Sequence, residues 1–200
     1  MSKRTAFIGD IHGDVGALSD ILASLDREGV GEKVFLGDYI NKGPSSREVI
    51  DTLLKLNEAP EVTLLTGNHE TELLNALESR NLGPFLKMGG ASTIRSYTEG
   101  PVSADVFSDF VEKIPRSHIQ GLKSMASKWE SSEVIASHEP IRNARGKFSV
   151  SAHVPVGLMP KIDKESAHID TSSISGGNLG RLTAFLWPDC SVLQVDRTSI

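Results

Sequence analysis

Three short apolar runs, each followed by a polar turn and then a helical pattern, constrain this chain more than any other feature of its sequence. The runs cover residues 5–9, 34–36 and 62–66. Apolar residues then recur at spacings of three and four over residues 15–25 and 45–56, and a third helix is expected to end near Arg80. Strand, turn and helix repeating at about 30 residues is typical of βαβ units in a parallel sheet. The sequence therefore predicts an α/β fold.

The middle of the chain, residues 81–132, has a different character. It is punctuated by a Gly-Pro and a Gly-Gly pair, and it lacks the alternation of strands and helices. Two amphipathic stretches, residues 105–114 and 119–129, predict helices. We interpret residues 81–132 as a helical insertion or cap within a single domain that covers residues 1–200.

From residue 133 onward, the pattern predicts short strands. They are expected at residues 134–136, 148–150, 168–170, 181–187 and 192–195. The Ser- and Gly-rich segment 172–180 predicts a turn between two of them. Three single residues carry smaller expectations: Ser45, with Glu48 three positions later, predicts a capping box, His118 is placed on the surface, and His168 is placed in a strand.

Polar clusters follow the first three apolar runs at the point where each predicted strand ends. They are Asp10 with His12, Asp38, and Asn68 with His69. In open α/β sheets, ligands bind outside the carboxyl ends of the strands, so these clusters are expected to face one crevice. His138 and His153 follow later strands in the same way. A Gly-Asp pair after a strand is more often only a turn. Three polar clusters and two further histidines that all follow predicted strands, however, together indicate a binding site.

Composition restricts the chemistry of that site. The chain has six histidines and one cysteine, so a bound metal would be held by imidazole and carboxylate and not by thiolate. No run of 18 apolar residues is present, which excludes a membrane span. The net charge of −5 argues against an extended nucleic-acid surface. No signal-peptide pattern opens the sequence, so we expect a cytoplasmic location.

Three sequence blocks resemble the signature of calcineurin-like metallophosphoesterases. They read Gly9-Asp10-Ile11-His12-Gly13, Gly37-Asp38-Tyr39-Ile40-Asn41-Lys42-Gly43-Pro44 and Gly67-Asn68-His69-Glu70. Segments around Gly89-Gly90, His138, His153 and residues 169–184 are similar to later blocks of the same family. The chain most resembles its phosphoprotein phosphatase branch, which includes bacterial and phage Ser/Thr phosphatases and diadenosine tetraphosphatases. The resemblance implies that family's fold: a β-sandwich core flanked by helices, with a small helical cap.

The resemblance also implies a site with two divalent metal ions. The first ion would be held by Asp10, His12 and a bridging Asp38, and the second by Asp38, Asn68, His138 and His153. Oxygen and nitrogen ligands suit manganese, which we expect, with iron, zinc or nickel as alternatives. Two such ions clamp a phosphate, which Asn68 would also contact, and lower the pKa of a shared water. His69 would act as the general acid that protonates the leaving oxygen.

Two adjacent residues depart from the family pattern. Where the family has Asp-Arg, this chain has Asn41-Lys42. The family's Asp pairs with the general-acid histidine, whereas Asn41 can pair with His69 but carries no charge. The family's Arg grips phosphate with a planar fork, whereas Lys42 offers only a point charge. We expect a working enzyme with a weaker acid and a looser grip, against the alternative of a redirected or nearly inactive site.

A third departure is a missing segment. His138 and His153 are only 15 residues apart, and the family's Trp-x-Arg element between them is absent. Arg142, or else Arg145, could contact the phosphate in its place, although an exposed loop arginine is the plainer interpretation.

Three functions remain open. The first is a phosphatase acting on phosphorylated proteins or small phosphomonoesters, and the second is a nucleotide-polyphosphate or phosphodiester hydrolase. The third is a weakly active or non-catalytic binding module, favoured only by the departures described above. The metal ligands do not separate the first two, because the ions contact only phosphate; residues 81–132 and 140–151 would choose the substrate. The sequence gives no indication of oligomeric state.

Overall fold

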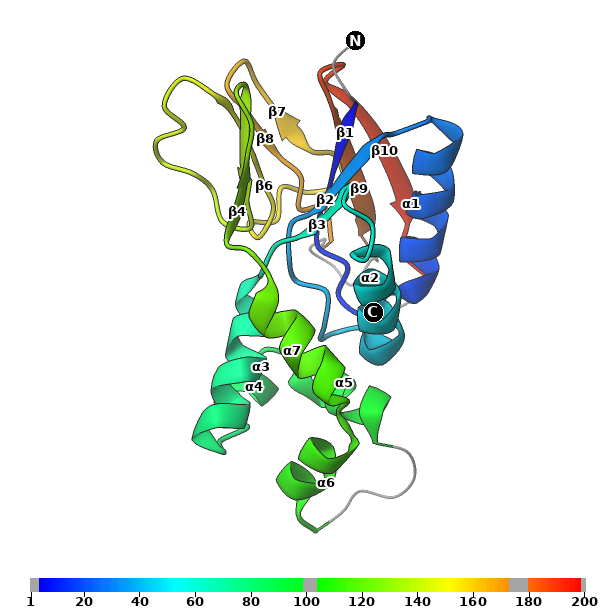
Figure 1. Ribbon diagram of the computed structural model, residues 1–200, viewed down its shortest axis with the longest axis vertical. Coiled ribbons are helices and arrows are strands. Elements are labelled where there is room, and N and C mark those ends of the chain that lie inside the picture. Colours follow the sequence, from blue (N-terminus) through cyan, green and yellow to red (C-terminus); the bar gives the residue numbers. More distant parts are fainter. Residues whose placement is uncertain (1–3, 99–103, 173–179, 199–200) are drawn as a thin grey trace.

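Two stacked five-stranded β-sheets form the centre of the molecule (Figure 1). The computed structural model describes residues 4–98, 104–172 and 180–198. The first sheet has the strand order β10-β9-β1-β2-β3. Its strands are β1 (Thr5–Ile8), β2 (Glu32–Phe35), β3 (Val62–Leu64), β9 (Arg181–Trp187) and β10 (Ser191–Asp196). Strands β1, β2 and β3 are parallel, whereas β9 and β10 are antiparallel to their neighbours.

The second sheet has the order β4-β5-β6-β8-β7. Its strands are β4 (Lys128–Glu130), β5 (Val134–Ser137), β6 (Phe148–Ser151), β7 (Lys161–Ile162) and β8 (Ser166–His168). The three central strands are parallel, and the edge strands β4 and β7 are antiparallel to them. In each sheet, the carboxyl ends of the parallel strands therefore lie at the same edge.

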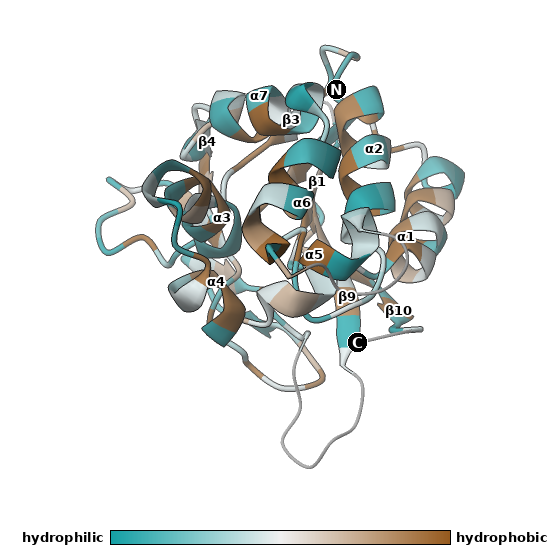
Figure 2. Ribbon diagram, turned by 90° about the horizontal axis from the view of Figure 1, so that it is seen from below, coloured by the Kyte–Doolittle hydropathy of each residue, from teal (hydrophilic) through white to brown (hydrophobic). Residues whose placement is uncertain are grey.

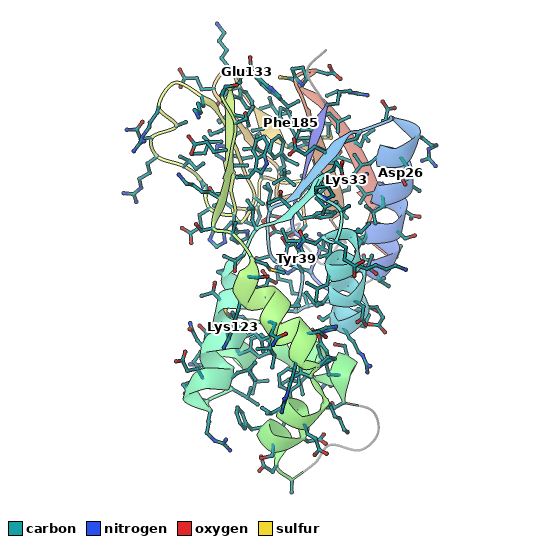
Figure 3. The ribbon with its side chains drawn as sticks, in the orientation of Figure 1. Asp26, Lys33, Tyr39, Lys123, Glu133 and Phe185 are labelled. Carbon is teal, nitrogen blue, oxygen red and sulfur yellow. The ribbon has the colours of Figure 1, made fainter. Side chains whose placement is uncertain are left out.

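Strand β1 is buried on both faces, which explains why apolar residues follow one another without alternation from Ala6 to Ile8. Phe7 packs between the two sheets, in a cluster that includes Phe185 from β9 and Val150 from β6. Its neighbours Ala6 and Ile8 point the other way, into a second cluster beneath the helices. Phe185 is labelled between the sheets in Figure 3. Removing a buried phenyl ring of this kind costs about 3–5 kcal/mol.

The described part of the chain contains seven helices around these sheets. Helices α1 (Val15–Arg27) and α2 (Ser46–Leu56) lie against the outer face of the first sheet. The others gather below the sheets in Figure 1: α3 (Asn68–Ser79), α4 (Gly83–Lys87), α5 (Gly90–Tyr97), α6 (Val106–Lys113) and α7 (Arg116–Ser124). The longer helices carry both hydrophobic and hydrophilic residues, as Figure 2 shows. The expected fold class, a sandwich flanked by helices with a small helical cap, is confirmed.

Three expectations about single elements were wrong. Helix α2 begins where Ser45 predicted, but the Ser45 side chain makes no capping hydrogen bond. The helix expected over residues 119–129 ends at Ser124, because Lys128–Glu130 pairs with β5 as an edge strand. His118 is buried and not on the surface: its ring bonds to the Tyr97 hydroxyl and to the Asp51 carboxylate, each at 2.8 Å.

The remaining strand expectations hold to within a few residues. The strand placed at 168–170 lies earlier, at Ser166–His168, so His168 is in a strand as expected. The turn expected over residues 172–180 lies almost entirely outside the described residues. Within the described part of the chain, no helix is long and apolar enough to cross a membrane.

Candidate metal centre

Loops from both sheets bring the candidate ligands together at one end of the sandwich. Asp10 and His12 follow β1, and Asp38 follows β2. His138 directly follows β5, and His153 lies two residues beyond β6. A further ligand, Asn68, is the first residue of α3. The six residues expected to bind metal therefore meet in space, although they lie far apart in the sequence.

Three ligand atoms converge tightly on the second-sheet side of the centre. His138 Nε2 lies 2.8 Å from Asn68 Oδ1, and His153 Nδ1 lies 3.0 Å from the same oxygen. The two ring nitrogens are 3.1 Å apart. Asp38 Oδ1 lies 3.3 Å from His138 Nε2. Two ring nitrogens and two oxygens, from four separate segments of the chain, thus crowd around one point.

The hydrogen bonds around His138 show that this point is suited to a cation. His138 Nδ1 lies 3.1 Å from the carbonyl oxygen of Leu36. A carbonyl only accepts, so Nδ1 carries the hydrogen and Nε2 of the neutral ring presents a lone pair. Burial, and then the neighbouring His153, lowers the pKa of His138 to about 4, which keeps the ring neutral. The lone pairs of His138 and Asn68 therefore face each other at hydrogen-bond distance with no hydrogen between them.

A divalent ion resolves this conflict. Around an ion with ligands at about 2.1 Å, neighbouring ligand atoms at right angles lie roughly 3 Å apart, which matches these separations. Asp10 supplies a second indication, since its Oδ1 is buried without a hydrogen-bond partner among the described residues. Burial, and then the nearby carboxylate of Asp170, raises the pKa of Asp10, while burial and then Glu70 raise that of Asp38. Bound cations would offset this concentrated negative charge.

The first-sheet side of the centre is wider. His12 Nε2 lies 3.7 Å from Asp10 Oδ2 and 4.0 Å from Asp38 Oδ2. His12 Nδ1 donates to the carbonyl of Ile40 at 3.1 Å, so the Nε2 lone pair is again directed into the centre. Lys42 reaches the same point, with its Nζ 2.7 Å from His12 Nε2. Asp38 contributes one oxygen to each side, which is the geometry that a bridging ligand requires.

His69 stands beside the centre, held by Asn41. Its Nδ1 lies 2.7 Å from Asn41 Nδ2, and its Nε2 lies 3.6 Å from Asp38 Oδ2. The Thr93 hydroxyl donates to Asn41 Oδ1 at 2.6 Å, which turns the Asn41 amide nitrogen toward the ring. Burial, and then the charge of Lys42, lowers the pKa of His69 to about 4. The ring is therefore neutral, with its hydrogen on Nε2 and facing the centre.

Glu70 fixes the loop that carries Asp38. Its carboxylate accepts hydrogen bonds from the backbone N–H groups of Asp38 and Tyr39, each at 2.8 Å, and from Gly67 at 3.0 Å. The Tyr39 hydroxyl in turn donates to the carbonyl of Leu65 at 2.6 Å, at the junction of sheets and helices labelled in Figure 3. A Cβ at Gly67 would collide with the Asp38 carboxylate, so only glycine fits there.

Several of these residues adopt a backbone conformation that non-glycine residues avoid. Left-handed φ angles occur at His12 (51°), Asp38 (55°), Asn41 (71°), Lys42 (64°) and His153 (66°). Each such conformation costs of the order of 1 kcal/mol and persists only where surrounding contacts hold it. Strain concentrated at the candidate centre is characteristic of functional sites.

Arg142 is not brought to the centre. It lines a separate surface cavity of about 490 Å³ on the loop between β5 and β6, together with Lys164 and His168. In the described part of the chain, it forms no hydrogen bond or ion pair with the candidate ligands. A different cavity of about 520 Å³ adjoins the centre and is lined by residues that include Asn68, His138 and Glu139.

The sequence alone did not reveal two supports of the centre, Thr93 and Arg197. Arg197 is buried, and its guanidinium donates to the backbone carbonyls of Asp10 and Ile11. The next residue, Thr198, bonds the Asp14 carboxylate through its backbone N–H at 2.8 Å. No local sequence pattern marks Arg197. Thr93 could have been singled out, because it lies in the segment around Gly89-Gly90 that is similar to a family block.

Comparison with known proteins gives matches along most of the chain. Residues 3–171 match the family model described as calcineurin-like phosphoesterase. The serine/threonine-protein phosphatase 4 catalytic subunit of Candida glabrata is 44% identical over 68 residues, which are 32% of this chain and 21% of that protein. The symmetrical bis(5'-nucleosyl)-tetraphosphatase of Buchnera aphidicola is 37% identical over 71 residues, or 35% of this chain and 25% of that protein.

Solved structures share the fold. A metallophosphoesterase from Sphaerobacter thermophilus superposes with a TM-score of 0.61 at 15% identity, covering 98% of this chain and 89% of that one. The aligned parts of the two curated relatives are a quarter or less of their length.

Proposed function

Because the chain belongs to the calcineurin-like phosphoesterase family, we propose that it is a metal-dependent hydrolase of phosphate monoesters, of the kind that acts on phosphoserine or phosphothreonine. The observation that carries this proposal is the convergence of His138 Nε2, Asn68 Oδ1 and His153 Nδ1 within 2.8–3.1 Å. The lone pairs of His138 Nε2 and Asn68 Oδ1 face each other at this distance, so these atoms, with His153 Nδ1 beside them, fit a metal ion better than they fit one another.

We propose two divalent ions, with manganese first and iron, zinc or nickel as alternatives. The first ion would be held by Asp10, His12 and Asp38, and the second by Asp38, Asn68, His138 and His153. When bound, the pair supplies positive charge against the phosphate and lowers the pKa of a water molecule. Asp38 suits the bridging position because its two oxygens face opposite sides of the centre.

The remaining residues of the site would position the phosphate and the leaving group. Lys42 brings an ammonium group to the mouth of the centre, where it would attract the phosphate. Asn68 would contact the phosphate from the other side. His69 directs Nε2 toward the centre, and in its protonated form it would donate the Nε2 hydrogen to the leaving oxygen and return to the neutral ring. Asn41 would hold His69 in this orientation, and Thr93 would hold Asn41.

The substrate class is proposed on the likeness to serine/threonine phosphatases. The likeness to a bis(5'-nucleosyl)-tetraphosphatase supports the alternative, a nucleotide-polyphosphate or phosphodiester hydrolase. The open cavity beside the centre leaves room for a protein loop or for a small phosphoester. A direct comparison of substrates separates the two.

The test is a panel assay with manganese. It compares p-nitrophenyl phosphate, a phosphoserine peptide, bis-p-nitrophenyl phosphate and diadenosine tetraphosphate at equal protein concentration. We expect turnover of the first two. Turnover of only the last two would contradict the monoester assignment and favour the alternative. Tight binding of two metal ions without any turnover would instead indicate a binding module.

A further inference from the structure

Lys42 and His12 make a contact that bears on how the proposed centre takes up metal. The Lys42 Nζ lies 2.7 Å from His12 Nε2. Because His12 Nδ1 donates to the carbonyl of Ile40, Nε2 carries the lone pair of the ring, and the ammonium donates a hydrogen into it. This is the lone pair that a metal ion on the first-sheet side would need.

The backbone holds Lys42 beside His12. Asn41 and Lys42 are two consecutive residues in the left-handed conformation, with φ of 71° and 64°. The next residue, Gly43, donates its backbone N–H to the carbonyl of His12 at 2.9 Å. The side chain of Lys42 therefore starts next to the histidine loop, and its ammonium group reaches Nε2 of His12 although the residue is exposed.

The two sides of the centre differ accordingly. On the second-sheet side, His138, His153 and Asn68 present their ligand atoms within 2.8–3.1 Å of one another. No lysine nitrogen contacts those atoms among the described residues. On the first-sheet side, the separations from His12 Nε2 to the two carboxylates are 3.7 and 4.0 Å, and the ammonium occupies its lone pair.

We infer that Lys42 is a built-in cation that competes with the metal ion on the His12 side, so that the two metal positions bind in order. The inference rests on the proposed metal-dependent function. An ion that binds His12 must break a charge-assisted hydrogen bond and displace a like charge, whereas an ion bound by His138, His153 and Asn68 meets neither cost. The His12 position is therefore the weaker one, by about tenfold or more.

Calorimetric titration of the metal-free chain with Mn²⁺ tests this order. For the wild type, we expect one tight and one weak class of site. Lys42→Met keeps the length of the stem and the backbone conformation but removes the charge, so the weak class should tighten by about tenfold while the tight class changes little. Lys87→Met, at the exposed end of α4, is the matched control and should leave both classes unchanged.

A spectroscopic measurement needs no variant. With one equivalent of Mn²⁺, the wild type should give the electron paramagnetic resonance spectrum of an isolated ion, and spin coupling should appear only with excess metal. Equal affinity at both positions, coupling at one equivalent, or a weak class unchanged in Lys42→Met would overturn the role of Lys42. Absence of any tight class in the wild type would instead contradict the proposed metal-dependent function, so the two failures are distinguishable.

Discussion

The side-chain amide of Asn41 lies 2.7 Å from Nδ1 of His69, and it presents nitrogen, not oxygen, to the ring. The Thr93 hydroxyl imposes this orientation by donating to the Asn41 oxygen at 2.6 Å. The ring nitrogen that faces Asn41 therefore accepts a hydrogen bond and cannot hold a proton at the same time. An aspartate at this position would accept from Nδ1–H and favour the charged ring.

Replacing Asn41 with Asp should therefore raise kcat. A carboxylate beside Nδ1 opposes the burial and the Lys42 charge that lower the pKa of His69, and so makes the ring a better proton donor. We expect kcat for p-nitrophenyl phosphate, with saturating Mn²⁺, to rise by about tenfold. Asn57→Asp makes the same chemical change at the exposed end of α2 and should leave kcat unchanged. A flat or lower kcat in Asn41→Asp would count against the role of this pair.

Replacing Asp38 with Asn should remove the metal together with the activity. Asp38 directs one oxygen toward His138 and the other toward His12 and His69, and an amide nitrogen cannot ligate an ion. We expect the affinity for manganese to fall by at least about 100-fold, so that elemental analysis after dialysis finds little bound manganese. The kcat should fall in parallel. Asp26→Asn, at an exposed carboxylate that pairs with Lys33 (both residues are labelled in Figure 3), should change neither. Unchanged metal content would show that Asp38 is not the bridging ligand.

That the candidate ligands lie close together could be predicted from the sequence because their position depends on local order along the chain. Asp10 and Asp38 lie two and three residues beyond the ends of the parallel strands β1 and β2, so a correct assignment of the strands brings them to one edge of the sheet. The sandwich could not be derived in the same way. Strand β4 has only three residues and is held by its pairing with β5. The helical periodicity of the residues before it continues into the strand, so the sequence predicted one helix over both.

Long-range partners explain the other misplacement. His118 falls in an amphipathic helix, and nothing in its own helix indicates that Asp51 of α2 and Tyr97 of α5 enclose it. Periodicity can show that one face of a helix is apolar, but it cannot show that a polar side chain finds two buried partners.

The bonds of His118 give a stability prediction. His118→Leu fills a similar space but leaves the buried Tyr97 hydroxyl without its partner, which should lower the free energy of unfolding by about 1–3 kcal/mol. Asp51→Asn keeps an acceptor oxygen at an exposed position and should cost less than about 1 kcal/mol. Urea denaturation followed by circular dichroism measures both. Equal, small effects would show that the Tyr97–His118 bond does not hold the helices together.

Arg197 lies at the far end of the sequence from the loop that it supports. No sequence pattern indicates this contact, so the following prediction rests on the structure alone. Its buried guanidinium donates to the carbonyls of Asp10 and Ile11, so it holds the main chain on which the first ligands are mounted. Arg197→Met keeps most of the volume but leaves both carbonyls without a donor, which should lower the free energy of unfolding by about 2 kcal/mol. Because Asp10 then loses its fixed position, Mn²⁺ affinity on the His12 side should fall by roughly tenfold, while the His138 side is less affected.

Arg181→Met, which removes an ion pair with the largely exposed Asp196, should cost less than about 1 kcal/mol and leave both affinities unchanged. Urea denaturation and Mn²⁺ calorimetry of the two variants give the comparison, and an Arg197→Met protein as stable and as metal-avid as the wild type would remove Arg197 from the support of the centre.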